Sequence, residues 1–350
     1  MPPRTAHHST HETHTRPVRS ERRSGLTVVR REVELIVNAR ASGAVDVAAR
    51  ATDALTAAGA RPRLHVTADE AELESVVRGA EDRRIVLVGG DGTVHALANL
   101  ELPAVPAAAL LPAGRANNIA RALGIPVDWT EAAKLAVRGR PAAIDALHVV
   151  TPRRTLFAVE GVSAGFHAAA RHRYTGVNSA DLTAGVRALA AELIGYRRHE
   201  LALRADGAPL FAGPAAQAFV SNLPFFGFGF HVDPVADATD GRLEAMVLDA
   251  ATRRDVVRLL AAARDGKHLG RDGVTWARAA RVDIERPVPL VADAQPLGVT
   301  TPSVTIAAGR LRMVAAHDGS IRAPERRVAP VAPRTGVVRR LRAVAAEARS

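Results

Sequence analysis

The feature that most limits the possible folds is a regular alternation of strands and helices between residues 32 and 150. Apolar runs typical of buried strands alternate with stretches whose apolar residues recur at helical spacing. We expect strands at residues 33–38, 63–66, 84–88 and 108–111, and helices at residues 44–59, 70–78 (with Asp69 as cap), after 93 to about 100, and 116–123. This order is typical of an α/β layer with a mostly parallel sheet.

The pattern changes after about residue 155. Short alternating runs follow one another, separated by turn signals such as Asp206-Gly207. We expect strands at residues 199–204, 215–221, 242–248, 280–285, 289–292 and 301–308, and helices at residues 180–195 and 253–264. Such a series is typical of an antiparallel sandwich. The chain is therefore predicted to form an α/β domain over residues 32–153 and a C-terminal β-sandwich domain over residues 154–320.

The net charge of +11 lies entirely in the two ends of the 350-residue chain. Residues 1–31 carry +5 and residues 321–350 carry +6, whereas residues 32–320 hold 32 basic and 32 acidic residues. A neutral body with basic ends is not the usual footprint of a nucleic-acid-binding fold, so no nucleic-acid partner is expected. Residues 1–31 are predicted to be a disordered tail. Residues 335–348 predict an Arg-rich amphipathic helix, for which an anionic membrane surface and simple solvation are equally good interpretations.

The composition excludes several kinds of chemistry. The chain has no cysteine, which rules out disulfides, Cys-ligated zinc, iron–sulfur clusters and thiol catalysis. The only Gly-Lys pair, Gly266-Lys267, precedes His268 rather than Ser or Thr, so there is no P-loop lysine. No apolar run approaches the roughly 20 residues that span a bilayer. We expect a cytoplasmic protein that associates with membranes peripherally; a homodimer is one of the oligomeric states left open.

The sharpest motif is residues 89–93, Gly-Gly-Asp-Gly-Thr, which follow an apolar strand directly and open a helix. Glycines there let the backbone approach a ligand and direct N–H groups at it. The helix N-terminus that follows favours an anion. The motif therefore predicts a phosphate cradle without lysine, although an ordinary tight turn is the alternative, because Asp-Gly is a common turn pair.

A second loop has the same setting. Residues 112–118, Pro-Ala-Gly-Arg-Ala-Asn-Asn, again follow a strand and open a helix. Both loops lie at carboxyl ends of strands, where open α/β sheets bind ligands.

At this point the sequence resembles the diacylglycerol kinase catalytic-domain family, which includes bacterial lipid kinases and the sphingosine and ceramide kinases. The resemblance covers about residues 33–316, and five motifs occur in the family's order. They are Asn38 to Gly43 (without the family's proline), Gly89 to Thr93 in full, Pro112 with Gly114, Asn117 and Asn118, then Asn222, Pro234, Ala236, Asp240 and Gly241, and finally Asp293-Ala294-Gln295.

The resemblance implies ATP-dependent phosphorylation of a lipid hydroxyl, with ATP and Mg²⁺ between the two domains. It implies that Asp293 is the general base, that Asp91 takes part in catalysis, and that Asp240 belongs to a metal–water network. The implied nucleotide contacts are Asn38, Gly89, Gly90, Asp91, Gly92, Thr93, Pro112, Gly114 and Asn117. Phosphoryl transfer needs mainly positioning and charge neutralisation, which such a set of loops, metal and base supplies.

Three departures from the family's pattern bear on activity. Gln295 replaces a Glu, Arg115 replaces a Thr in the second loop, and Ala96 stands where the family often has Glu. A catalytically weak or inactive ATP-binding homologue with a regulatory role is therefore the alternative to an active kinase, because a fold does not guarantee a function.

Two other activities are weaker alternatives. Gly161-Val162-Ser163-Ala164-Gly165 fits the Gly-x-Ser-x-Gly elbow of serine hydrolases, with Asp240 and His268 or His317 following in the right order. NAD kinases share the Gly-Gly-Asp-Gly-Thr loop but lack the second loop at this spacing.

Four of the eight Phe residues, Phe225, Phe226, Phe228 and Phe230, are interpreted as an apolar rim or core beside the acceptor site, and no histidine is given a role.

Overall fold

A computed structural model describes residues 32–39, 44–102, 104–173, 182–227 and 229–316. Its first region is a parallel layer in which the strand order is β2-β1-β3-β4. All the strands and helices expected up to residue 123 are present here. The elements of this region are β1 (Glu32–Asn38), α1 (Ala44–Ala57), β2 (Arg61–Thr67), α2 (Glu70–Gly79), β3 (Arg84–Gly89), α3 (Asp91–Ala98), β4 (Ala108–Pro112), α4 (Asn118–Ala122) and α5 (Trp129–Arg138).

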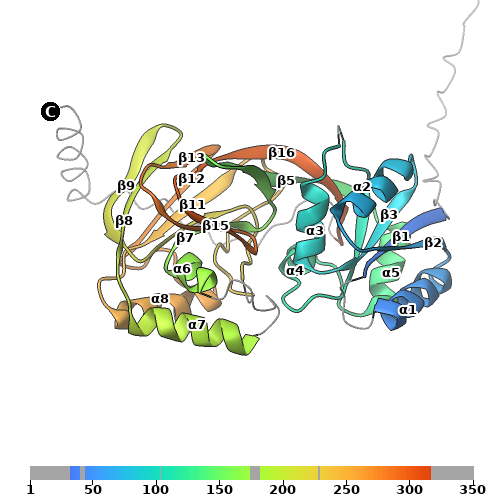
Figure 1. Ribbon diagram of the computed structural model, residues 1–350, viewed down its shortest axis with the longest axis horizontal. Helices are drawn as coiled ribbons and strands as arrows, with labels where there is room; N and C mark the ends of the chain where they lie inside the picture. Colours follow the sequence, from blue (N-terminus) through green and yellow to red (C-terminus); the bar gives the residue numbers. More distant parts are fainter. Residues whose placement is uncertain (1–31, 40–43, 103, 174–181, 228, 317–350) are drawn as a thin grey trace, which may run out of the picture.

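Helices cover both faces of this layer, with α1 and α5 on one side and α2 and α3 on the other (Figure 1). The central strands β3 and β4 are therefore buried on both faces, which explains why they are almost continuously apolar. Asp69 is the N-cap of α2 as expected, and its Oδ1 accepts a hydrogen bond from the Glu72 amide at 2.9 Å. Helix α4 begins at Asn118, two residues later than predicted, because Asn117 has a left-handed φ of 48°.

The second region is built from antiparallel strands, as the sequence predicts. Six of them form a separate sheet in the order β12-β11-β10-β7-β14-β15. The elements are β5 (Pro141–Val150), β6 (Thr155–Ala158), β7 (Gly161–Gly165), α6 (Phe166–His172), α7 (Leu182–Ile194), β8 (His199–Ala205), β9 (Ala208–Ala215), β10 (Gln217–Ser221), β11 (Leu243–Leu248), α8 (Arg253–Arg264), β12 (Val274–Ala279), β13 (Arg281–Ile284), β14 (Val288–Ala292), β15 (Gln295–Thr300) and β16 (Ser303–Val314).

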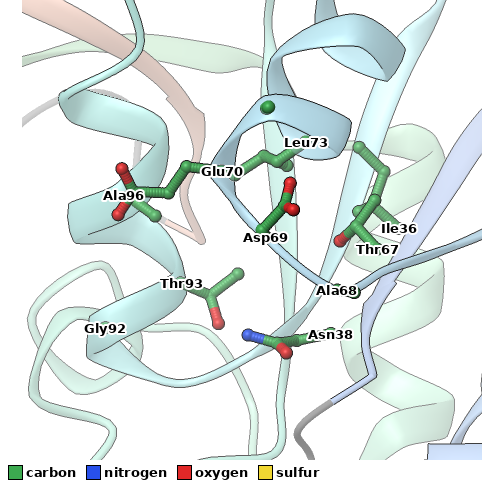
Figure 2. Close-up of a pocket in the computed structure, with 11 residues that line it drawn as sticks. Ile36, Asn38, Thr67, Ala68, Asp69, Glu70, Leu73, Gly92, Thr93 and Ala96 are labelled. Atoms are coloured by element: carbon green, nitrogen blue, oxygen red, sulfur yellow. The ribbon is translucent and has the colours of Figure 1, made fainter.

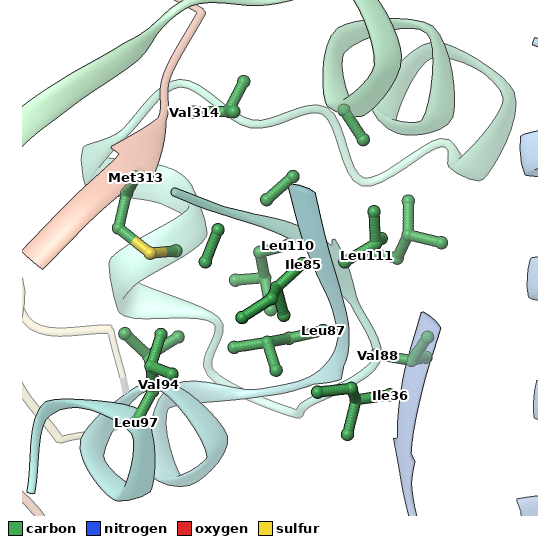
Figure 3. Packing of buried hydrophobic residues seen from close by; sticks show 14 of the residues in the cluster. Ile36, Ile85, Leu87, Val88, Val94, Leu97, Leu110, Leu111, Met313 and Val314 are labelled. Carbon is green, nitrogen blue, oxygen red and sulfur yellow. The ribbon is translucent and has the colours of Figure 1, made fainter. Parts of the chain in front are cut away.

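The remaining strands of the second region face this sheet and continue the parallel layer. Strand β16 pairs with β5 and β13 along its length and, at Met313, with β4 in parallel. An apolar cluster that includes Leu147, Val220 and Leu290 fills the space between the two sheets, which makes the region a sandwich. The end of β16 inserts Met313 and Val314 beside Leu97 and Leu110 of the first core (Figure 3). The last strand of the chain therefore joins the two cores.

Several elements were not among the expected ones, notably α5, β5, β9 and β12. Strand β9 contains Pro209, Gly213 and Pro214, which weaken the local strand signal, yet it pairs with β8 through a bulge.

The expected division at residues 153 and 154 lies in the turn between β5 and β6 and stays a prediction. Both basic tails lie outside the described residues. Within the described residues, no helix is long and apolar enough to cross a membrane.

Candidate functional site

The two glycine loops meet at backbone distance. They follow the adjacent parallel strands β3 and β4, and the Ala113 amide donates to the Gly89 carbonyl at 2.8 Å. A Cβ on Gly90 would lie 2.8 Å from the Cα of Gly114, and a Cβ on Gly114 would lie 2.6 Å from the Cα of Gly90. Real Cβ atoms do not approach backbone so closely, so both positions require glycine. The loops that the sequence identified separately therefore form one structure.

Other predicted residues hold the loops in shape. A Cβ on Gly89 would lie 2.1 Å from Thr93 Oγ1, so Gly89 leaves room for the Thr93 side chain. Asn117 closes the second loop, because its Oδ1 accepts from the Gly114 amide at 3.0 Å and its Nδ2 donates to the Gly114 carbonyl at 2.8 Å. Trp129 of the unexpected helix α5 donates from Nε1 to the carbonyl of Pro112 at 2.8 Å.

Asp91 connects the first loop to the second. It is the first residue of α3, and its Oδ1 accepts from the Ile119 amide at the start of α4, at 2.9 Å. Burial and the negative charge of Asp293 raise the pKa of Asp91, against the lowering effect of these backbone hydrogen bonds. The Asp91 carboxylate therefore holds the start of α4 in place and also lies near Asp293.

A cavity of about 500 Å³ opens next to the first loop, between α2 and α3 (Figure 2). Three of the predicted nucleotide contacts, Asn38, Gly92 and Thr93, line it. The Glu70 side chain of α2 also lines the cavity, as does Ala96 of α3 (Figure 2). The complete lining is Ile36, Asn38, Thr67, Ala68, Asp69, Glu70, Ala71, Leu73, Gly92, Thr93 and Ala96.

Asp293 enters the site from the turn between β14 and β15, with a left-handed φ of 50°. Its side chain is only 4% exposed, and four nitrogen atoms lie within hydrogen-bond distance of its two oxygens. Oδ1 accepts from the amides of Glu160 (2.8 Å) and Gly161 (3.1 Å). Oδ2 accepts from the amide of Val159 (2.9 Å) and lies 2.7 Å from Nδ1 of His95.

His95 is a site residue that sequence reasoning did not identify. It lies one helical turn after Asp91 on α3, and it is the side chain through which the first region reaches Asp293. Burial acts to lower the pKa of His95, but the hydrogen bond to Asp293 and the charges of Asp293 and Glu70 outweigh burial, so that the net shift is upward. The spacing of four residues from Asp91 was the available signal, because i and i+4 share a helix face.

Glu160 is a second missed residue. It is buried directly before β7, and its Oε2 accepts from Asn118 Nδ2 at 2.7 Å. Burial, with the charges of Asp91 and Asp293, raises the pKa of Glu160 well above its usual range. Asn118 also donates to the Gly227 carbonyl at 2.8 Å, while its buried Oδ1 has no hydrogen-bond partner. Asp91, Glu160 and Asp293 therefore form an acidic group where the two regions meet.

Asp240 does not belong to this group. Its Oδ2 pairs with Arg278 Nη2, and its Oδ1 accepts from the Arg242 amide at 2.9 Å. Burial raises the pKa of Asp240, against the lowering effect of Arg278. Across the described residues, no three His, Asp or Glu side chains are grouped so as to hold a metal ion. The residues around Asp240 thus do not fit a resident metal, because a guanidinium already occupies that side of the carboxylate.

Ser163 does not have the geometry of a hydrolase nucleophile. It lies in the middle of strand β7 with 0% exposure, and its Oγ lies 3.0 Å from His167 Nδ1 and 2.9 Å from Gln217 Nε2. A nucleophile elbow instead presents its serine on an exposed strand-to-helix turn. His268 is also fully buried, with Nε2 at 2.9 Å from the Val232 carbonyl.

The phenylalanines of residues 225–230 divide into two groups. Phe226 is buried in an apolar cluster with Phe219 and Val232, and Phe230 packs against it. Phe225 stacks on His231 at 4.8 Å between ring centroids, and the Arg121 guanidinium lies 3.9 Å from its ring centroid. Phe228 lies outside the described residues. The core interpretation therefore suits Phe226, whereas Phe225 lies on the side of α4.

The chain is similar to known proteins over both of its regions. The diacylglycerol kinase catalytic domain matches residues 32–149, and the YegS C-terminal NAD kinase beta sandwich-like domain matches residues 160–315. A "Probable lipid kinase YegS-like" protein of Stenotrophomonas maltophilia is 30% identical over 273 residues, which cover 73% of this chain and 87% of that protein. A diacylglycerol kinase of Mycobacterium tuberculosis is 27% identical over 230 residues, covering 61% of this chain and 69% of that protein.

Solved structures show the same fold. The crystal structure of a diacylglycerol kinase from Bacillus anthracis superposes with a TM-score of 0.60 at 19% sequence identity, over 83% of this chain and 98% of that chain. Together with the match to the Stenotrophomonas protein over 73% of this chain, these similarities confirm the resemblance that the five sequence motifs indicated. The chain therefore belongs to the diacylglycerol kinase catalytic-domain family of lipid kinases, within its YegS-like branch.

Proposed function

We propose that this chain transfers the γ-phosphoryl group of ATP to a lipid hydroxyl, with Asp293 as the general base. The observation that carries the proposal is the contact between Asp293, from the sandwich, and His95, from the helix that the first glycine loop opens. This contact brings a buried carboxylate next to the edge where both loops end. Phosphoryl transfer requires such a base beside a phosphate cradle. Membership of the family supports the same activity.

The nucleotide half of the proposal rests on the cavity and the loops. A volume of about 500 Å³ lies within the range of small-molecule sites. The amides at the start of α3 favour phosphate, whereas the carboxylates of Asp69 and Glu70 in the cavity lining repel it. We therefore assign the phosphates to the glycine loops and the nucleoside to the cavity that Asn38 and Thr93 line.

The acceptor half rests on Asp293. In the reaction the lipid hydroxyl oxygen forms a bond to the γ-phosphorus, the bond from that phosphorus to the bridging oxygen of ADP breaks, and the hydroxyl proton passes to the carboxylate. Three amides and His95 fix the carboxylate in one orientation before substrate arrives, which limits the reorganisation that the step requires. His95 is the positioning residue in this set, since it is the side-chain contact of Asp293 from the nucleotide-binding region.

Magnesium enters this proposal only as the ion that accompanies ATP as substrate. Asp240 is bonded to Arg278, so no step is assigned to a metal held there. We interpret the Asp240–Arg278 pair as a link between the loop before β11 and strand β12, with Glu244 as the second carboxylate of Arg278 at 3.0 Å.

Two of the departures from the family's pattern have substitutes nearby. Glu70 lines the same cavity as Ala96 and so supplies a negative charge to the cavity into which the family often places a Glu (Figure 2). Arg115 is exposed on the second loop, where its guanidinium is available to a phosphate oxygen. Gln295 is exposed on β15, and we identify no substitute for its missing charge among the described residues. These substitutes favour an active kinase over an inactive homologue.

The test is a kinase assay with labelled ATP, Mg²⁺ and a panel of diacylglycerol, sphingoid base, ceramide and polyprenol, together with calorimetric titration of ATP. We expect label in at least one lipid and saturable ATP binding. ATP binding without transfer to any lipid would favour the regulatory homologue. Absence of both would contradict the nucleotide assignment itself.

A further inference from the structure

Helix α7 exposes a side on which four of six positions are apolar, the other two being Thr183 and Arg187. Its 13 residues contain only two charged side chains, Arg187 and Glu192. Val186 is 55% exposed and Ile194 is 71% exposed. The exposed positions Thr183, Val186, Arg187, Ala190, Ala191 and Ile194 recur at spacings of three and four, so they lie along one side of the helix. A helix on the surface of a globular protein normally presents its polar side to water, so this face is suited to a partner.

Helix α8 is the charged neighbour of α7. It carries four Arg and one Asp, a net charge of +3, and the side chains of Arg253, Arg254, Arg258 and Arg264 are exposed. Leu189 and Leu193 of α7 pack on the same apolar cluster as Val256 and Leu259 of α8. Both helices lie along the lower edge of the sandwich in Figure 1. An apolar face and an arginine-rich helix therefore lie over one layer of the molecule.

This part of the surface lies close to the turn that carries Asp293. Helix α6 packs against both α7 and β14, so it bridges the two. Arg171 of α6 donates to the carbonyl of Ala294, the residue after Asp293, at 3.3 Å. His172 Nε2 lies 3.1 Å from the carbonyl of Leu290. Only one helix therefore separates the exposed face of α7 from the proposed base.

We propose that the exposed side of α7, flanked by the arginines of α8, is the surface that docks on an anionic lipid bilayer. The inference rests on the proposed lipid kinase activity, since it names the surface through which the substrate's membrane is approached. Apolar side chains of an interfacial helix enter the boundary between head groups and acyl chains, and neighbouring arginines attract anionic head groups. A second copy of the chain fits less well, because a two-fold dimer would bring the same basic helices together.

The absence of cysteine makes a direct test simple. Ala190→Cys places a single thiol on the exposed side of α7, and Val127→Cys places one on a 77% exposed position before α5. Each full-length variant is labelled with an environment-sensitive fluorophore and mixed with phosphatidylglycerol vesicles, without ATP. We expect a blue shift and a rise in emission for the label at residue 190, no change at residue 127, and little response at either position with phosphatidylcholine vesicles.

A second pair of variants measures the contribution to binding. Val186→Ser with Ile194→Ser should weaken cosedimentation with the anionic vesicles roughly tenfold, and Arg253→Gln with Arg254→Gln should weaken it at low salt. Val45→Ser with Val127→Ser, which removes two apolar side chains that are 83% and 77% exposed elsewhere, should leave binding unchanged.

Three results would overturn the inference. A label at residue 190 that stays in water while the protein cosediments would show that another surface, such as a tail, docks. A shift that depends on protein concentration without vesicles would identify a second copy as the occupant. Unchanged binding by the Val186/Ile194 variant would exclude a contribution of the apolar face. A short-chain, water-soluble acceptor tests the kinase activity separately. If the Val186/Ile194 variant still phosphorylates this acceptor, the variant has lost docking and has kept the proposed function.

Discussion

The two regions of the molecule contribute different kinds of chemical groups to the site. The α/β region supplies mainly backbone: two loops that touch at Gly90 and Gly114, and the amides at the start of α3. The sandwich supplies a side chain, Asp293, held by the amides of residues 159–161. The difference follows from the strands. Adjacent parallel strands end side by side and leave room for a ligand, whereas an antiparallel hairpin projects its turn residue toward the neighbouring region.

The largest expected effect separates the two contributions. Asp293→Asn removes the proposed base while leaving the α/β region intact, so kcat should fall by about a thousandfold, within the range for general base catalysis. The affinity for ATP should stay within a factor of about three, since Asn38 and the glycine loops are unchanged. Steady-state kinetics and ATP calorimetry measure both quantities. Asp53→Asn, on the exposed side of α1, is the control and should match the parent; a variant at residue 293 that keeps its rate would remove the base from the proposal.

A second prediction tests the glycine loops, which are the backbone contribution of the α/β region. Gly90→Ala places a Cβ 2.8 Å from the Cα of Gly114, so one loop must shift. We expect the free energy of unfolding to fall by about 1–3 kcal/mol, as for other overpacked positions, and the affinity for ATP to fall more than tenfold. Gly79→Ala, where no atom lies within 4 Å of the added Cβ, is the matched control. If ATP affinity survived in Gly90→Ala, the two loops would not be the phosphate cradle.

The contact between the regions should make stability depend on pH. The folded pKa of His95 lies above the ordinary histidine value of 6.5, so the His95–Asp293 pair stabilises fully below about pH 6.5 and this stabilisation is lost as pH rises through the raised pKa. His95→Gln should therefore lose more free energy of unfolding at pH 6 than at pH 9. Denaturant unfolding of both proteins at the two pH values measures this. The groups that face His95 are Asp293, Glu70 and Arg154. An equal loss at both values would mean that the pair is not ionic.

The pH profile of kcat adds a readout that a purely structural His95 would not change. If His95 orients Asp293, the acid limb of the profile should move in His95→Gln, while His172→Gln, at a histidine of α6 whose Nε2 lies 3.1 Å from the Leu290 carbonyl, should keep the parent profile. A profile that is unchanged in His95→Gln would contradict the positioning role.

The smallest expected effect concerns Ala96. If the carboxylate of Glu70 substitutes for the missing Glu, Glu70→Gln should lower kcat about three- to tenfold. Restoring the family's residue in the double variant Glu70→Gln, Ala96→Glu should recover most of the rate. Glu101→Gln, at an exposed position after α3, is the control. A full rate in Glu70→Gln would show that the cavity functions without this charge.

The sequence predicted the site unevenly, for physical reasons. Gly90 was identifiable because tight loops need glycine, whereas Gly114 and Asn117 were identified by resemblance to the family's second loop. His95 and Glu160 were not identifiable, because a single His or Glu carries no local signal of a distant partner. Asp293 lies 198 residues from His95, and Asn118 lies 42 residues from Glu160. Asp240 was identified by resemblance, but Arg278, which pairs with it, lies 38 residues further along the chain.

The sequence by itself determined the strand–helix alternation, the two glycine loops and the confinement of net charge to the ends, since each depends on near neighbours in the chain. Tertiary structure decided which side chains meet. It brought Asp293 to His95, Glu70 and Ala96 into the lining of one cavity, and the end of β16 into the first core. It also left the apolar side of α7 exposed. Local patterns specify which conformation a segment adopts, whereas only the completed fold decides which distant charges and apolar faces become neighbours.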